Sequence, residues 1–135
     1  KANDRGFLSK DILVSDLISL RGDIHHLFPK DYLKKNGLDR SKYNQIANYV
    51  YMQSEINIKV GNKPPKDYFE VVTTQMLNGN QLVSGLSNEQ QLLDNLKMNC
   101  VPTEIQHMSI DDYNDFLTLR RKLMATKIKE YYHAL

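Results

Sequence analysis

Hydrophobic residues along this chain recur mainly at spacings of three and four, the period of an amphipathic helix. The pattern predicts helices over 11–20, 30–35, 54–62, 66–77, 88–98 and 109–135, with a helical turn or ordered loop over 41–47. Asn36-Gly37 reads as a helix end, and Ser109 with Asp112 has the spacing of a capping box. The last helix is expected to be amphipathic, with its charges opposite an apolar stripe of Ile110, Tyr113, Leu117, Met124, Ile128, Tyr131 and Leu135.

Two short segments depart from the helical period and predict strands. One covers residues 23–27 and holds two histidines, and the other covers residues 48–53 and is rich in tyrosine and valine. The expected fold class is therefore α+β and mostly helical.

The size and composition of the chain fit one compact domain over residues 1–135. Lys1 is followed by neither a signal peptide nor a presequence, so we expect a C-terminal fragment of a longer protein. No apolar run approaches the roughly 20 residues that span a bilayer, so no membrane segment is expected. The single cysteine, Cys100, excludes an internal disulfide and a cysteine-based zinc cluster. A reducing, cytoplasmic location is expected.

Positive charge is concentrated in the first half of the chain. Twelve Lys and Arg stand against seven Asp and Glu through Lys66, whereas six stand against nine from Asp67 onward. Clustered cations are what a phosphate backbone attracts, although a solvated basic face would give the same split.

The histidine pair lies in this basic half, in the stretch "GDIHHLFPKDYL". Neighbouring residues on a strand point to opposite faces, so His25 and His26 cannot perform the same task. Two structural histidines are the simpler interpretation of the pair alone. However, Asn48 follows at the start of the second predicted strand and Asn57 inside the next predicted helix.

That order resembles the ββα-metal nucleases, also called HNH or His-Me finger nucleases, through "DIHHLFP", "IANYVYM" and "SEINIKVGNK". The longer stretches "DIHHLFPKDYLKK", "IANYVYMQSEINIKVGNKPPKDYF" and "FLTLRRKLMATKIKEYY" resemble the C-terminal nuclease half of GmrSD-type restriction proteins. The resemblance implies a ββα-metal core of two antiparallel strands and a helix over 22–63, with a helical remainder over 64–135. It also implies two partners, DNA and a missing N-terminal ParB-like, nucleotide-hydrolysing half.

The resemblance also assigns roles to the residues. His26 matches the general base, and an imidazole with an ordinary pKa near 6.5 suits that task. His25 and Asn57 match the metal ligands, and Asn48 matches the asparagine that ties the loop to the strand and orients the catalytic histidine. Asp23, two residues before His25, could add a carboxylate to the metal or orient its imidazole.

One divalent ion is the implied cofactor. A bound divalent cation would stabilise charge on the phosphate and on the leaving 3′ oxygen as a Lewis acid. Mg is the first expectation, but many family members carry an aspartate where this chain has His25. An imidazole suits Mn, Ni or Zn at least as well, so these remain alternatives.

Other candidates carry two interpretations each. Lys30, Lys59 and Lys63 are candidate phosphate contacts or solvated charges. Residues 120–122, two arginines and a lysine, are candidates for holding DNA or for forming a charged face that is solvated or packed on the missing half. Tyrosines 49, 51, 131 and 132 could stack on bases, although core packing is the commoner use.

Three functions follow from the sequence. The first is a metal-dependent DNA endonuclease domain of a restriction or anti-phage defence protein. The second is a nucleic-acid-binding module that keeps the nuclease scaffold without cutting. The third is a regulatory or interaction domain. The complete set of His25, His26, Asn48 and Asn57 favours the first, because a decayed nuclease would be free to lose its base.

Overall fold

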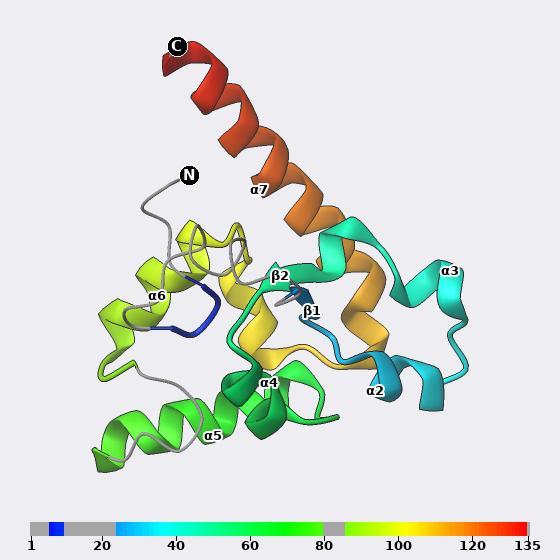
Figure 1. Cartoon of the computed structure of the whole chain (residues 1–135), viewed down its shortest axis with the longest axis vertical. Coiled ribbons are helices and arrows are strands. Elements are labelled where there is room, and N and C mark those ends of the chain that lie inside the picture. The colour runs from blue at the N-terminus through cyan, green and yellow to red at the C-terminus, as the bar shows by residue number, and fades with distance from the viewer. Residues whose placement is uncertain (1–5, 10–23, 80–85, 135) are drawn as a thin grey trace.

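The computed structural model describes residues 6–9, 24–79 and 86–134, and in these ranges it is mostly helical with a two-stranded antiparallel sheet (Figure 1). The helix expected over 11–20 lies outside the described residues. The elements in chain order are β1 (Ile24–His26), α2 (Lys30–Lys35), α3 (Arg40–Tyr43), the 3-10 turn η1 (Ile46–Asn48), β2 (Tyr49–Tyr51), α4 (Ser54–Val60), α5 (Pro65–Asn78), α6 (Glu89–Met98), the 3-10 turns η2 (Thr103–His107) and η3 (Ile110–Asp112), and α7 (Tyr113–Ala134).

The expected α+β, mostly helical class is confirmed, and both predicted strands form, although each is only three residues long. His25 pairs with Val50 and His26 pairs with Tyr49. Beyond the ladder, the Leu27 amide donates to the Asn48 carbonyl at 2.8 Å. A two-stranded sheet this short is not stable by itself in water, so it depends on packing against the helices.

A continuous hydrophobic core lies at the exit of β1. Leu27 and Phe28 are fully buried, and the Phe28 ring lies 5.1 Å from that of Tyr113 and 4.9 Å from that of Phe116. From α5, the buried Tyr68 hydroxyl donates to the Leu27 carbonyl at 2.7 Å. The core therefore holds the backbone that immediately follows the histidine pair.

The segment 6–9 joins this core from far away in the sequence. Asn95 of α6 accepts from the Leu8 amide at 2.8 Å and donates to the Gly6 and Ser9 carbonyls at 3.0 and 3.1 Å. The Phe7 amide donates to the Tyr51 carbonyl at 2.7 Å, at the end of β2. Figure 1 shows this segment, in dark blue, beside α6.

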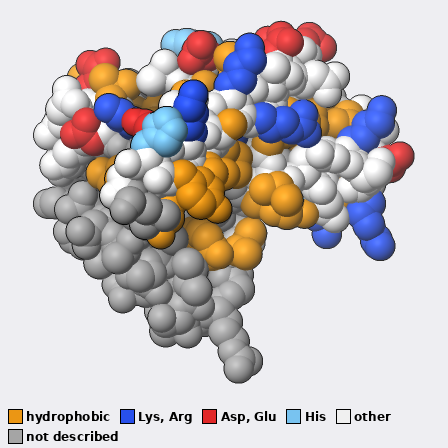
Figure 2. All heavy atoms as spheres, turned by 90° about the horizontal axis from the view of Figure 1, so that it is seen from above, with side chains coloured by type: hydrophobic (Ala, Val, Ile, Leu, Met, Phe, Trp, Pro, Cys, Tyr) orange, Lys and Arg blue, Asp and Glu red, His pale blue; other side chains and the backbone are white. Residues whose placement is uncertain are grey.

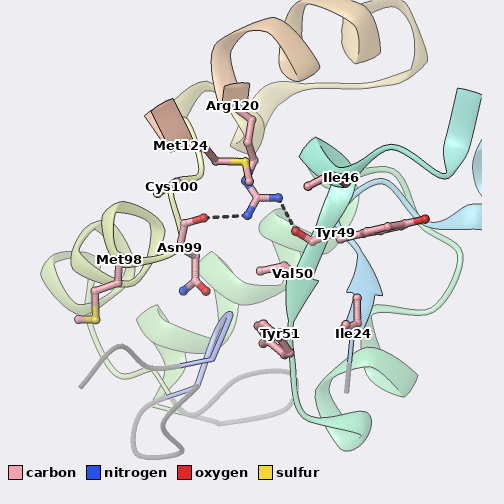
Figure 3. A pocket seen from close by; sticks show the side chains of 10 residues that line it. All are labelled: Ile24, Ile46, Tyr49, Val50, Tyr51, Met98, Asn99, Cys100, Arg120 and Met124. Carbon is pink, nitrogen blue, oxygen red and sulfur yellow. Dashed lines mark hydrogen bonds between the residues drawn. The ribbon is translucent and has the colours of Figure 1, made fainter. Parts of the chain in front are cut away.

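Arg120 is an exception to the charged outer face expected on the last helix, where its neighbours Arg121 and Lys122 are exposed. Its side chain is only 5% exposed and its guanidinium donates to the carbonyls of Ala47, Tyr49 and Asn99 (Figure 3). Burial lowers the pKa of Arg120 to about 10, so the group stays charged at neutral pH. The positive charge lies at the carbonyl end of α6, where the helix dipole favours a cation.

The apolar stripe predicted along the whole last helix packs only over its first half. Phe116 and Leu117 are buried, whereas Ile128, Tyr131 and Tyr132 are exposed. Figure 1 shows the end of α7 projecting from the rest of the described structure. The capping box of Ser109 and Asp112 forms as expected, but it caps η3, which leads into α7.

In the ranges that the structure describes, none of the helices combines the length and the apolar character that crossing a bilayer requires.

The burial of two tyrosines predicts that the free energy of unfolding falls at alkaline pH. Burial raises the pKa of Tyr113 to about 12 and also raises the pKa of Tyr68. An unfolded tyrosine ionises near pH 10, so above that pH the unfolded chain releases protons that the folded chain retains. Stability should therefore be intact below pH 10 and fall as pH rises towards 12, by at most about 1.4 kcal/mol per pH unit for each tyrosine.

Chemical denaturation between pH 8 and 11.5 measures this loss. Tyr113→Phe should make the decline shallower, whereas Tyr131→Phe, at an exposed tyrosine of the same helix, should leave its slope unchanged. Equal slopes for the wild type and Tyr113→Phe would contradict the assignment.

Candidate functional site

His26 lies at the end of β1, where its ring contacts Asn44, Tyr43 and Tyr49. Its Nε2 lies 3.0 Å from the side-chain oxygen Oδ1 of Asn44. The ring packs edge-to-face on Tyr49 at 5.1 Å and on Tyr43 at 6.3 Å. An amide oxygen only accepts hydrogen bonds, so in the neutral imidazole Nε2 carries the proton and Nδ1 keeps its lone pair. The contact with the Asn44 oxygen therefore favours the tautomer in which Nδ1 can accept a proton.

Asn48 is fully buried and uses its whole amide group on backbone partners. Its Oδ1 accepts from the Phe28 amide at 2.8 Å, and its Nδ2 donates to the carbonyls of Phe28 and Tyr43 at 3.1 and 3.3 Å. These bonds fasten the exit of β1 and the end of α3 to the start of β2. Asn44 directly follows Tyr43, and His26 lies two residues before Phe28, so Asn48 fixes the backbone near both partners of their contact.

His25 lies in the middle of β1, and Asn57 lies inside α4. Residues opposite each other in a ladder share a face, so His25 lies with the buried Val50, on the other face from His26. Asn57 lies inside α4, which begins two residues after β2, and its side chain is partly exposed. Asp23 lies outside the described residues.

The donor types of His25 and Asn57 suit a divalent metal ion. Imidazole nitrogen favours Mn, Ni or Zn, and an amide oxygen also suits Mg. Within the described ranges, no group of three or more His, Cys, Asp or Glu comes together as a metal cluster. Among the described residues, a metal held by His25 and Asn57 would thus find no cluster of further ligands, and water or phosphate oxygens could complete its coordination, as they commonly do for Mg.

The three candidate phosphate contacts are all solvent-exposed. Lys30 opens α2 directly after the Phe28-Pro29 step, Lys59 lies in the last turn of α4, and Lys63 lies between α4 and α5. Lys30 is thus four residues from His26 along the chain, whereas Lys59 and Lys63 lie two and six residues after Asn57.

Sequence reasoning missed one residue of the site, Asn44, and named Arg121 only as one of three candidate DNA contacts in the last helix. Asn44 was one polar residue among several in a predicted turn, and nothing in its spacing marks it as the partner of His26. Arg121, next to the buried Arg120, is exposed and its Nη2 donates to Oε1 of Gln45 at 3.0 Å. Consecutive residues on a helix point about 100° apart, which separates the two arginines. Arg121 therefore adds a cation beside the loop that contains Asn44, the residue whose side chain contacts His26.

Comparisons with known proteins give one distant relative. No family model matches the chain, and no solved structure matches it. An uncharacterized protein of Methanocaldococcus jannaschii is 27% identical over 116 residues, which cover 78% of this chain and 20% of that protein. The chain thus spans about a fifth of the length of the curated relative it matches. Because that protein is uncharacterized, the similarity does not indicate a function for this chain.

The role of Asn48 can be measured without any assay of activity. Asn48→Ala should destabilise the chain by about 2 to 4 kcal/mol, because the buried Phe28 amide and two carbonyls lose their partner. Chemical denaturation gives the loss, and hydrogen exchange should show faster exchange at Phe28. Asn114→Ala, at an exposed asparagine of α7, is the matched control and should have little effect. Unchanged stability and exchange in Asn48→Ala would refute this account.

Proposed function

We propose that this chain is a metal-dependent DNA endonuclease domain of the ββα-metal, or HNH, type, and that it hydrolyses phosphodiester bonds. The observation that carries the proposal is the setting of His26, whose Nε2 is engaged by Asn44 while Nδ1 keeps its lone pair. Phosphodiester hydrolysis needs a base that accepts a proton from water near neutral pH, and imidazole is suited to it. The elements β1, β2 and α4 occur along the chain in the order strand, strand, helix, which is the order expected of such a core.

Each residue then has one task. Nδ1 of His26 takes the proton of the attacking water, and Asn44 holds the ring so that Nε2 keeps its own proton. Asn48 positions the backbone on either side of this contact. His25 and Asn57 would hold a divalent ion, with Asp23 as a possible third ligand. When bound, that ion supplies positive charge that stabilises the phosphate and the leaving oxygen.

The binding of DNA rests on cations around the same site. Arg121 lies beside the loop that contains Asn44 and Gln45, and Lys30 follows the exit of β1. Both are exposed and can meet phosphates as salt-dependent contacts. Restriction or anti-phage defence in the cytoplasm, within a longer protein whose N-terminal half is ParB-like and hydrolyses nucleotides, completes the proposal.

A second function is favoured by the exposed end of α7. Ile128, Tyr131 and Tyr132 form an apolar surface that catalysis at His26 does not need. A nucleic-acid-binding or regulatory domain that keeps the nuclease scaffold but docks on another domain would use this surface. Such a domain would bind nucleic acid or its partner without cutting.

Nicking of supercoiled plasmid in Mg, Mn or Ni separates the two functions. His26→Ala should lower the cleavage rate at least about 100-fold, because it removes the base. His107→Ala, at an exposed histidine after α6, is the matched control and should cut normally. The assay should use both this chain and the longer protein, and calorimetry should show weaker metal binding by His25→Ala. Cutting that survives His26→Ala would rule out the proposed mechanism, and binding without cutting would favour the second function.

Asn44 supplies a finer test of the same site. Asn44→Ala should lower kcat about ten- to a hundredfold with little change in KM, because the imidazole loses its orientation but the phosphate contacts remain. Asn44 is exposed, so the free energy of unfolding should hardly change. Asn36→Ala, at an exposed asparagine that ends α2, serves as the control. A change confined to KM would show that Asn44 contributes to DNA binding instead.

A further inference from the structure

An apolar pocket lies directly beside the proposed catalytic histidine. It opens between the sheet, the end of α6 and the middle of α7, and has a volume of about 340 Å³. Its lining includes Ile24, Ile46, Tyr51, Met98, Arg120 and Met124. We call it the sheet–helix pocket. Tyr49 also lines it, while the Tyr49 ring packs edge-to-face on His26 at 5.1 Å. Figure 3 shows that ring directed away from Arg120. One residue thus separates the pocket from the imidazole.

The rim of the pocket exposes large apolar side chains to water. Ile24 is 49% exposed and Ile46 is 73% exposed. Figure 2 shows hydrophobic side chains gathered on one face of the molecule with Lys and Arg side chains nearby. The volume lies at the lower end of the roughly 300 to 1,000 Å³ typical of ligand sites, so it suits one flat ring system better than a folded segment.

The charge of the pocket favours an electron-rich occupant. Among the described residues that line it, Arg120 is charged and none is acidic. The three printed bonds of Arg120 all go to backbone carbonyls, and its buried Nε–H has no hydrogen-bond partner among the described residues. A guanidinium has five donor hydrogens, so this cation has donors left for a ring carbonyl or a ring nitrogen. A flat, aromatic acceptor fits both the walls and the cation.

We propose that the sheet–helix pocket binds a single nucleobase, unstacked from the strand that is cut at His26. This inference rests on the proposed function, because only a nucleic-acid substrate brings a base next to the scissile phosphate. Tyr51, Ile24 and the two methionines give the base an apolar and aromatic surface, and Arg120 offers a donor to its edge. Stacking on tyrosine tolerates any base, so the pocket favours an unpaired nucleotide over a particular sequence.

Binding without cleavage tests the pocket separately from the chemistry. The full chain is titrated in EDTA with a fluorescent single-stranded oligonucleotide, and with the same oligonucleotide made abasic, by anisotropy. Tyr51→Leu keeps an apolar side chain but removes the ring, and should weaken binding of the normal strand about tenfold. It should leave the abasic strand unaffected, because phosphate contacts remain. Leu77→Ala, at a leucine 83% exposed near the end of α5, is the control and should bind both strands normally.

Further variants keep the inference falsifiable. If Tyr51→Leu does not fold, Met124→Trp fills the pocket and should cause the same selective loss. Equal affinity for normal and abasic strands, or a folded Met124→Trp that binds like the wild type, would overturn the inference. Competition by a free nucleoside monophosphate more strongly than by the oligonucleotide would overturn the assignment to the cut strand.

The outcome also separates this inference from the proposed nuclease. His26→Ala should still bind the normal strand more tightly than the abasic strand, since the imidazole does not line the pocket. If the chain cuts DNA but binds the normal and abasic strands equally, only the assignment of the pocket to a nucleobase is overturned. If the chain binds the abasic strand more weakly but never cuts, the pocket assignment is supported and the proposed nuclease activity is overturned.

Discussion

The buried guanidinium of Arg120 is the interaction on which the rest of the structure depends. It binds the carbonyls of Ala47 and Tyr49 around the start of β2 and the carbonyl of Asn99 at the end of α6. A strand of three residues has too little surface to hold its own place. Three elements distant in sequence therefore meet on one cation, and an uncharged replacement would leave buried carbonyls without a donor.

The candidate site depends on this arrangement through the hydrogen bonds of Asn48. Arg120 fixes β2 from the side of α7, and Asn48 fixes the beginning of β2 against the exit of β1 and the end of α3. His26 and Asn44 lie on the two backbone segments that Asn48 joins. In a buried polar network of this kind, each hydrogen bond that is made avoids the cost of an unpaired polar group. The hydrogen bonds of the scaffold and the orientation of the imidazole are consequently parts of one network.

Local signals predicted the element boundaries well, and tertiary partners account for what they missed. Asn36-Gly37 ends α2 as its residue types predict, and the last turn of α4 stops before Gly61, whose φ of 61° favours glycine. Strand alternation likewise predicted the division of His25 and His26 between two faces, which the register matches. The burial of Arg120 was not predictable, because its carbonyl partners belong to other elements. Asn44 was missed for the same reason, and the metal ligands stay a prediction.

The motif that resembles a nuclease is shorter than the unit that folds around it. Phe7 extends hydrogen bonding at the end of β2, and Asn95 of α6 fastens residues 6–9 into the core. A peptide trimmed to residues 22–63 would keep both histidines and both asparagines of the motif, yet Leu27 and Phe28 would face water. Transplanting the site into another scaffold would therefore require the contributions of α5, α6 and α7 as well as the motif.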